Sequence, residues 1–136
     1  MASILIMEDE DQMRAVLRQM LESSGHEVME AADGVEGIRL YHEKPADVVI
    51  VDIIMPEKEG FETIKELKRD FPEVKLIAIS GGGFLGAEPY LKMAEGLGVT
   101  HQLAKPIERK ELLDAVQELL CQSCTGSNER NTEAQY

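Results

Sequence analysis

The sequence predicts an α/β fold in which a parallel sheet is covered by helices on both faces. Short apolar runs alternate five times with segments of helical periodicity. Two of these runs, "DVVIV" at 47–51 and "VKLIAI" at 74–79, are almost continuously apolar, as expected for strands buried on both faces. Strands separated by single helices favour parallel pairing with right-handed crossovers. A length of 136 residues suits one domain with a real core.

The predicted strands are short apolar runs, most of them rich in Val, Ile and Leu. In chain order they span Ser3–Met7, Glu27–Ala31, Asp47–Val51, Val74–Ile79 and, with a weaker pattern, His101–Ala104.

The predicted helices fill the intervals, because apolar residues there recur at the i, i+3, i+4 spacing of one helical face. Three clear stripes are Met13, Val16, Leu17, Met20 and Leu21; Phe61, Ile64, Leu67 and Phe71; and Leu112, Leu113, Val116, Leu119 and Leu120. Shorter patterns predict helices around 34–43 and 88–97. The stop signals are Gly25, Pro45, Pro72, Gly96 and Gly98.

The composition narrows the classes of partner. A formal net charge of −12 disfavours direct contact with nucleic-acid phosphates and anionic membranes. The opening apolar run "SILIM" is followed at once by acids, so neither a secretory signal nor a membrane-inserted segment is predicted, and we expect a cytoplasmic protein. The final "TGSNERNTEAQY" has no apolar period. We expect a domain over residues 1–122 and a disordered tail over 123–136.

Candidate site residues follow four of the five predicted strands, and Asp33 and Gly34 after the second form an ordinary turn. Glu8 and Asp9 follow the first, Asp52 ends the third, Ser80 follows the fourth and Lys105 follows the fifth. In an open parallel sheet, ligands bind beyond the carboxyl ends of the strands. If the first and third strands are neighbours, the three acids converge. Two carboxylates about 4 Å apart repel by about 4 kcal/mol at an effective dielectric near 20. A divalent cation, best Mg²⁺, would compensate.

These side chains suit phosphoryl transfer to an aspartate. Asp52 can attack in line, while the metal and Lys105 offset charge on the equatorial oxygens and Ser80 supplies a hydroxyl donor. Each residue also has an ordinary explanation, since strand-end acids are often solvated, serines cap loops and lysines lie on surfaces. Their coincidence at one sheet edge favours the functional interpretation.

Four segments carry a resemblance to a known family: "ILIMEDE" at 4–10, "DVVIVDIIMPEKEGFE" at 47–62, "LIAISG" at 76–81 and "LAKPI" at 103–107. The sequence resembles the receiver domain of bacterial two-component response regulators, and the D-x-x-M-P-x-x-x-G element is its most specific part. The resemblance implies a flavodoxin-like (βα)5 three-layer sandwich with strand order 2-1-3-4-5. It further implies a stand-alone signalling switch of a two-component system or a phosphorelay, similar to a chemotaxis messenger.

The resemblance also implies roles for individual residues. Asp52 would take a phosphoryl group from a histidine kinase, a phosphotransfer protein or a small phosphodonor. Mg²⁺ would be held by Asp9, Asp52 and the backbone carbonyl of Ile54, with Glu8 acting through water. The residues that would bind the phosphoryl group or move with it are Ser80, Gly81, Lys105 and Pro106. The Lys105–Pro106 peptide is expected to be cis, as in the family. Such a domain assists its own phosphorylation and dephosphorylation without being an enzyme for other substrates.

Phosphorylation would change a protein-binding surface around the fourth helix, fifth strand and fifth helix, which a downstream effector protein reads. Tyr90, His101 and Gln102 are candidate positions, although all three could be ordinary exposed residues. Many receivers carry Tyr or Phe three positions before the lysine, where Gln102 stands here. That replacement puts an aromatic relay in doubt and leaves phosphorylation untouched.

Two other function classes remain open. Gly81, Gly83 and Gly86 match the G-x-G-x-x-G loop of nucleotide or flavin carriers, but such a loop normally follows the first strand and has an acid about 20 residues on. A Mg²⁺-dependent phosphatase with an aspartyl-phosphate intermediate usually has a second aspartate two residues after the nucleophile, where Ile54 stands.

The two cysteines form a C-x-x-C pair, Cys121 and Cys124. The pair lies at the end of the last predicted helix, where the helix dipole disfavours a thiolate. We therefore assign it no redox or zinc chemistry.

Overall fold

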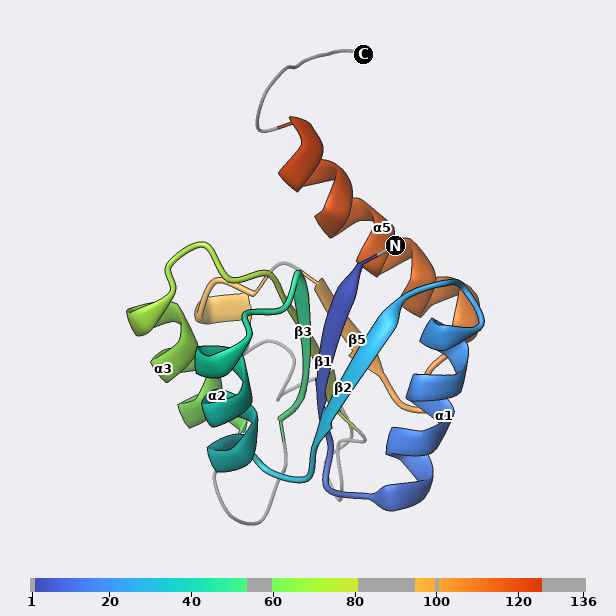
Figure 1. Cartoon of the computed structure of the whole chain (residues 1–136), viewed down its shortest axis with the longest axis horizontal. Coiled ribbons are helices and arrows are strands. Elements are labelled where there is room, and N and C mark those ends of the chain that lie inside the picture. The colour runs from blue at the N-terminus through green and yellow to red at the C-terminus, as the bar shows by residue number, and fades with distance from the viewer. Residues whose placement is uncertain (1, 54–59, 81–94, 100, 126–136) are drawn as a thin grey trace.

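The computed structural model describes residues 2–53, 60–80, 95–99 and 101–125, with side chains as far as residue 121. Strands and helices alternate along the chain from β1 to β4 (Figure 1). Their bounds are β1 Ser3–Met7, α1 Asp11–Glu22, β2 Glu27–Ala31, α2 Gly34–Glu43, β3 Val48–Asp52, α3 Gly60–Asp70, β4 Leu76–Ser80, β5 His101–Ala104 and α5 Arg109–Thr125.

The five strands form one sheet in the order β2-β1-β3-β4-β5, and every neighbouring pair is parallel. The predicted fold class and strand order are therefore confirmed. The register places Met7 beside Val51, Asp52 beside Ile79 and Ser80 beside Ala104. Because all strands run the same way, their carboxyl ends lie together along one edge of the sheet.

Two strands are shifted by one or two residues from the prediction. Strand β3 spans Val48–Asp52 instead of 47–51, and β4 spans Leu76–Ser80 instead of 74–79. The later start of β4 has a local reason: the Val74 amide donates to the carbonyl of Phe71 at 2.9 Å, so Val74 belongs to the turn after α3. Most of the helix predicted around 88–97 lies outside the described residues.

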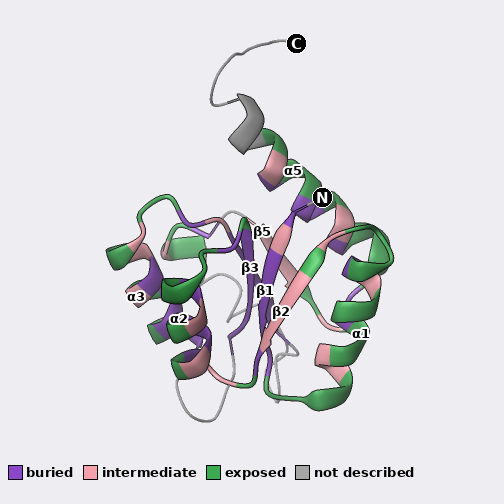
Figure 2. Ribbon diagram, in the orientation of Figure 1, coloured by how far each residue is buried: buried purple, intermediate pink, exposed green. Residues whose placement is uncertain are grey.

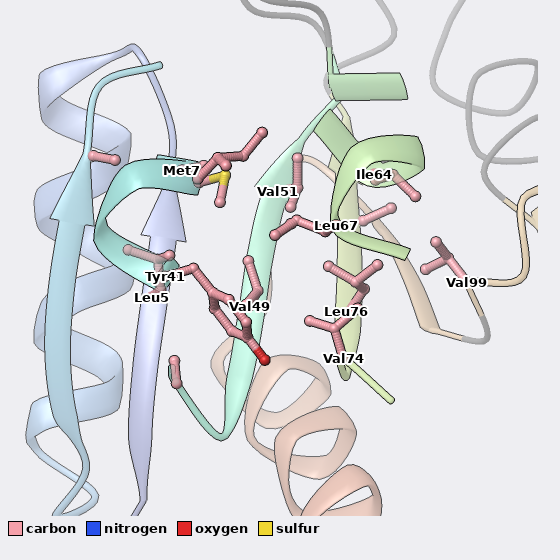
Figure 3. Close-up of a cluster of buried hydrophobic side chains, with 14 of the residues drawn as sticks. Leu5, Met7, Tyr41, Val49, Val51, Ile64, Leu67, Val74, Leu76 and Val99 are labelled. Atoms are coloured by element: carbon pink, nitrogen blue, oxygen red, sulfur yellow. The ribbon is translucent and has the colours of Figure 1, made fainter. Parts of the chain in front are cut away.

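The core has two halves, one on each face of the sheet, because successive strand residues point to opposite faces. Strand β1 gives Leu5 to one half and Ile4 to the other. The first half packs against α2 and α3, and Figure 3 shows Tyr41 and Leu67 over the strands there. The second half packs against α1 and α5. Figure 2 shows the central strands buried between these helix layers. This is the expected three-layer sandwich.

Local signals fix where the helices meet the sheet. The Asp33 side chain accepts from the Glu36 amide at 2.8 Å and caps α2. Gly25 has φ 90°, a conformation that favours glycine, in the turn after α1. At the start of α3, the Gly60 amide donates to the carbonyl of Ile53 at 2.8 Å. The Asp33 cap and the Gly60 hydrogen bond hold the starts of α2 and α3 close to the carboxyl ends of β2 and β3. Among the described residues, no helix is long and apolar enough to cross a membrane.

Candidate functional site

Three carboxylates from two strands meet at the carboxyl edge of the sheet. Glu8 and Asp9 directly follow β1, and Asp52 is the last residue of the adjacent β3. Oxygen atoms of these three side chains lie within 4.8 Å of one another. Strand pairing accounts for the convergence, because Met7 and Val51 are partners in the register and each acid lies just beyond them. The predicted meeting of the three acids at one point is therefore confirmed.

Lys105 brings the opposing charge. Its Nζ lies 2.9 Å from Oε1 of Glu8 and 3.2 Å from Oδ2 of Asp52. The backbone holds it there, since the Lys105 amide donates to the carbonyl of Ser80 at 2.9 Å. The Lys105–Pro106 peptide is cis, as the resemblance implied. One ammonium thus joins β5 to acids at the ends of β1 and β3.

The site is buried on one side and open on the other. Glu8 is fully buried, Asp52 is 3% exposed and Ser80 is buried at the end of β4, whereas Asp9 is exposed. Glu8 Oε1 accepts no hydrogen bond from the described residues although Lys105 Nζ is near, so that contact is ionic. Its other oxygen, Oε2, accepts from the Glu10 amide at 3.2 Å.

This burial perturbs the protonation of the cluster. Burial is the main cause that raises the pKa of Glu8, and the neighbouring Asp52 adds to it while Lys105 opposes it. The pKa of Asp9 is also raised, by partial burial and then by its contact with Glu8. Burial by itself would lower the pKa of Lys105, but the contacts with Glu8 and Asp52 outweigh it and raise the pKa. The carboxyl groups are thus crowded, and the ammonium is firmly charged.

A small divalent cation fits this donor set. Three carboxylates face one ammonium, so negative charge is in excess when the acids are ionised. The single Lys105 ammonium is shared between Glu8 and Asp52, so it cannot neutralise all three acids. Carboxylate oxygens with access to water are the ligands that Mg²⁺ prefers. One member of the cluster, Asp9, is on the open side, where water can complete a coordination shell.

Comparisons with known proteins agree with this arrangement. The family model described as the response regulator receiver domain matches residues 4–117. The chain belongs to this family. The chemotaxis protein CheY of Halobacterium salinarum is 31% identical over 117 residues, which is 86% of this chain and 95% of that protein. The sensor kinase CckA of Brucella abortus is 33% identical over 121 residues, which is 88% of this chain but only 12% of the kinase.

The receiver domain also resembles solved structures. A response regulator receiver domain protein from Clostridium thermocellum superposes with a TM-score of 0.84 at 28% identity, and the match covers 91% of this chain and 98% of that one. The family is a phosphoacceptor signalling switch, not an enzyme in the ordinary sense. Its members bind Mg²⁺ at an acidic cluster, and the cluster of this receiver is Glu8, Asp9 and Asp52.

Of the remaining predicted residues, three lie within the described part of the chain and three lie outside it. Pro106 follows Lys105 at the sheet edge. His101 lies on β5, where its Nε2 is 2.8 Å from Oε1 of Glu118 on α5. The side-chain amide of Gln102 donates to the carbonyl of Val99, so it is directed toward the segment entering β5. The others, Ile54, Gly81 and Tyr90, lie outside the described residues, as does the glycine loop.

One contact at the site was not predicted from the sequence. Arg14, on the first turns of α1, donates from Nη1 to the backbone carbonyl of Glu8 at 2.8 Å. The only sequence signal is a basic residue five positions after Asp9, beside the apolar stripe of the helix. Its target depends on how α1 returns along the sheet, which periodicity does not specify.

Proposed function

We propose that this receiver domain takes a phosphoryl group onto Asp52 with the help of Mg²⁺ and passes the change to a partner protein. The observation that carries the proposal is the cluster itself. Glu8, Asp9 and Asp52 have oxygens within 4.8 Å of one another, with one lysine ammonium against two of them. A buried carboxyl group whose pKa is raised by burial and by a neighbouring acid, as for Glu8, is a candidate for a functional site.

In the proposed reaction, a carboxylate oxygen of Asp52 attacks the phosphorus atom. The new O–P bond forms as the bond from phosphorus to the leaving nitrogen of a phosphohistidine, or to the leaving oxygen of an acyl phosphate, breaks. Lys105 keeps its proton, moves its ion pair from Asp52 to the phosphoryl oxygens, and stabilises their charge. Ser80, and Gly81 after it, would donate hydrogen bonds to the same oxygens. Pro106 fixes the turn behind the lysine.

The metal would be held by Asp9, Asp52 and the Ile54 carbonyl, with Glu8 contributing through water. When bound, Mg²⁺ offsets the charge of the carboxylates and of the incoming phosphoryl group. Until then, the charge of Lys105 is divided between Glu8 and Asp52, which keeps the crowded acids together. The chain thus supplies the nucleophile, the ammonium and the oxygen ligands.

The partners are proposed by class. A histidine kinase or phosphotransfer protein would donate the phosphoryl group, and a downstream effector protein would read the result around β5 and α5, where His101 pairs with Glu118 and Gln102 is held by Val99. Tyr90 is a further proposed position on that surface. The net charge of −12 argues against nucleic acid as the direct target.

The test is incubation with acetyl phosphate and Mg²⁺, followed by intact-protein mass spectrometry. We expect one added phosphoryl group on the wild type and none on Asp52→Asn. Asp114→Asn, an exposed acid on α5 that pairs with Lys110, is the matched control and should be phosphorylated like the wild type. Omitting Mg²⁺ should abolish the addition. Labelling of Asp52→Asn at the wild-type level would refute the assignment of the acceptor.

A further inference from the structure

We propose that Arg14 is a positioning residue for the acidic cluster, acting through the backbone of the segment between β1 and α1. The inference rests on the proposed function, since it concerns how Glu8 and Asp9 are presented to Mg²⁺. Arg14 touches none of the reacting groups in the described contacts. Its guanidinium instead makes one contact from each of its three nitrogens, to three different parts of the chain.

The three contacts enclose the metal-binding segment. Nη1 donates to the carbonyl of Glu8 at 2.8 Å, Nη2 to Oδ1 of Asp11 at 2.6 Å, and Nε to Oε1 of Glu30 at 3.1 Å. Glu8 and Asp11 bracket the turn, and Glu30 lies on β2. The Arg14 side chain is 18% exposed, against 47% for Arg18 one turn later. A planar fork with donors in fixed directions can join three acceptors in this way, while a lysine ammonium cannot reproduce them.

The contact with the Glu8 carbonyl bears directly on the ligands. Strand pairing with β2 ends at Met7, and the Glu8 amide is tied to the carbonyl of Ala31 at 3.1 Å. The next peptide group joins Glu8 to Asp9 and is planar. A hydrogen bond on its oxygen therefore fixes the direction in which the chain leaves the strand, and with it the position of the Asp9 Cα atom. Without that bond, the turn that carries Asp9 has one fewer restraint.

Arg18 supplies a matched comparison. It lies on the same helix, carries the same charge and also pairs with Glu30, but its other described partner is Glu22. Replacing either arginine by methionine removes one positive charge near the acids. Electrostatics by itself would then strengthen binding of a cation. Loss of positioning predicts weaker binding of the cation instead, and it predicts this for the Arg14 variant but not for the Arg18 variant.

The experiment measures Mg²⁺ affinity by isothermal titration calorimetry for the wild type, Arg14→Met, Arg14→Lys and Arg18→Met. We expect about tenfold weaker binding for Arg14→Met, as for other residues that orient metal ligands. Arg14→Lys should bind between the wild type and Arg14→Met, and Arg18→Met should bind at least as tightly as the wild type. Saturating Mg²⁺ should restore the phosphorylation rate of Arg14→Met toward the wild-type value.

A second readout needs no metal. The Glu10 amide donates to Oε2 of Glu8, so its hydrogen exchange reports on order in the segment. In metal-free protein we expect faster exchange at Glu10 in both Arg14 variants and no change in Arg18→Met. If Arg14→Met does not fold, the Mg²⁺ affinity and the Glu10 exchange rate of Arg14→Lys test the inference. Wild-type affinity and wild-type exchange in Arg14→Lys would then overturn the inference.

Unchanged or tighter Mg²⁺ binding by folded Arg14→Met would also overturn it. If the wild type itself does not bind Mg²⁺, the proposed function fails. The exchange comparison would still decide whether Arg14 holds the segment in place.

Discussion

Replacing Glu8 by glutamine is expected to stabilise the metal-free protein at neutral pH. Glu8 is fully buried, and its carboxylate is within 4.8 Å of the oxygens of Asp9 and Asp52. Glutamine has the same size, and its carbonyl oxygen can still accept from the Glu10 amide. The substitution therefore removes a charge while keeping the shape and one hydrogen bond.

The magnitude follows from the distances. At an effective dielectric near 20, Asp52 repels Glu8 by at least about 3.5 kcal/mol, and the exposed Asp9 adds about 1 kcal/mol in a water-like dielectric. Lys105, 2.9 Å away, attracts Glu8 by about 6 kcal/mol on the same scale. The interactions between charges thus leave a net attraction of only about 1.5 kcal/mol, whereas burying the ion costs several kcal/mol. We expect Glu8→Gln to gain about 1–2 kcal/mol, or roughly 5 °C in Tm for a domain of this size.

The gain should depend on pH in a defined direction. Because burial raises the pKa of Glu8 in the folded state, the protonated side chain favours the fold below its unfolded pKa. That stability is lost as the pH rises through the folded pKa. The difference between Glu8→Gln and the wild type should therefore be near zero around pH 4 and grow to a plateau at higher pH.

The assay is urea denaturation followed by circular dichroism, in EDTA, from pH 4 to pH 8. Glu43→Gln, an exposed residue paired with Arg39, is the control and should change stability by less than about 0.5 kcal/mol. Mg²⁺ should favour the wild type more than the variant, because a ligand that binds only the folded state stabilises it in proportion to affinity. A variant less stable than the wild type in EDTA at pH 7, or a difference independent of pH, would refute the reasoning.

Two further predictions test the surroundings of Asp52. Gly60→Ala should destabilise the fold by about 3 kcal/mol in thermal denaturation, because the new Cβ atom would lie 2.4 Å from the Cα atom of Ile53 and backbone atoms cannot shift as side chains do. The control is Gly96→Ala, whose Cβ atom would meet nothing within 4 Å, and its stability should be close to that of the wild type. Lys105→Met leaves two buried carboxylates without their ammonium, so it should lower the free energy of unfolding in EDTA by about 3 kcal/mol, and Mg²⁺ should restore part of this loss. Equal stability of this variant and the wild type in EDTA would contradict the assigned ion pairs.

The sequence by itself determined the order of strands and helices, because those depend on short-range apolar periodicity. Runs such as 47–51 and the stripe containing Leu17 and Leu21 predicted elements that the structure contains, with shifts of one or two residues in β3 and β4. The acids were found in the same way, since each directly follows a recognisable strand. The order of the strands in the sheet did not follow from the apolar pattern, because any parallel order satisfies that pattern. Only the resemblance to the receiver family specified the order 2-1-3-4-5.

The tertiary structure decided how the residues at the sheet edge meet. Pairing of β1 with β3 sets the separation of Glu8 and Asp52, and the position of β5 lets one ammonium reach both. The contact from Arg14 to the Glu8 carbonyl likewise depends on how α1 packs against the sheet. Such distances result from the packing of elements far apart in the chain, and the sequence pattern within each element carries no information about them.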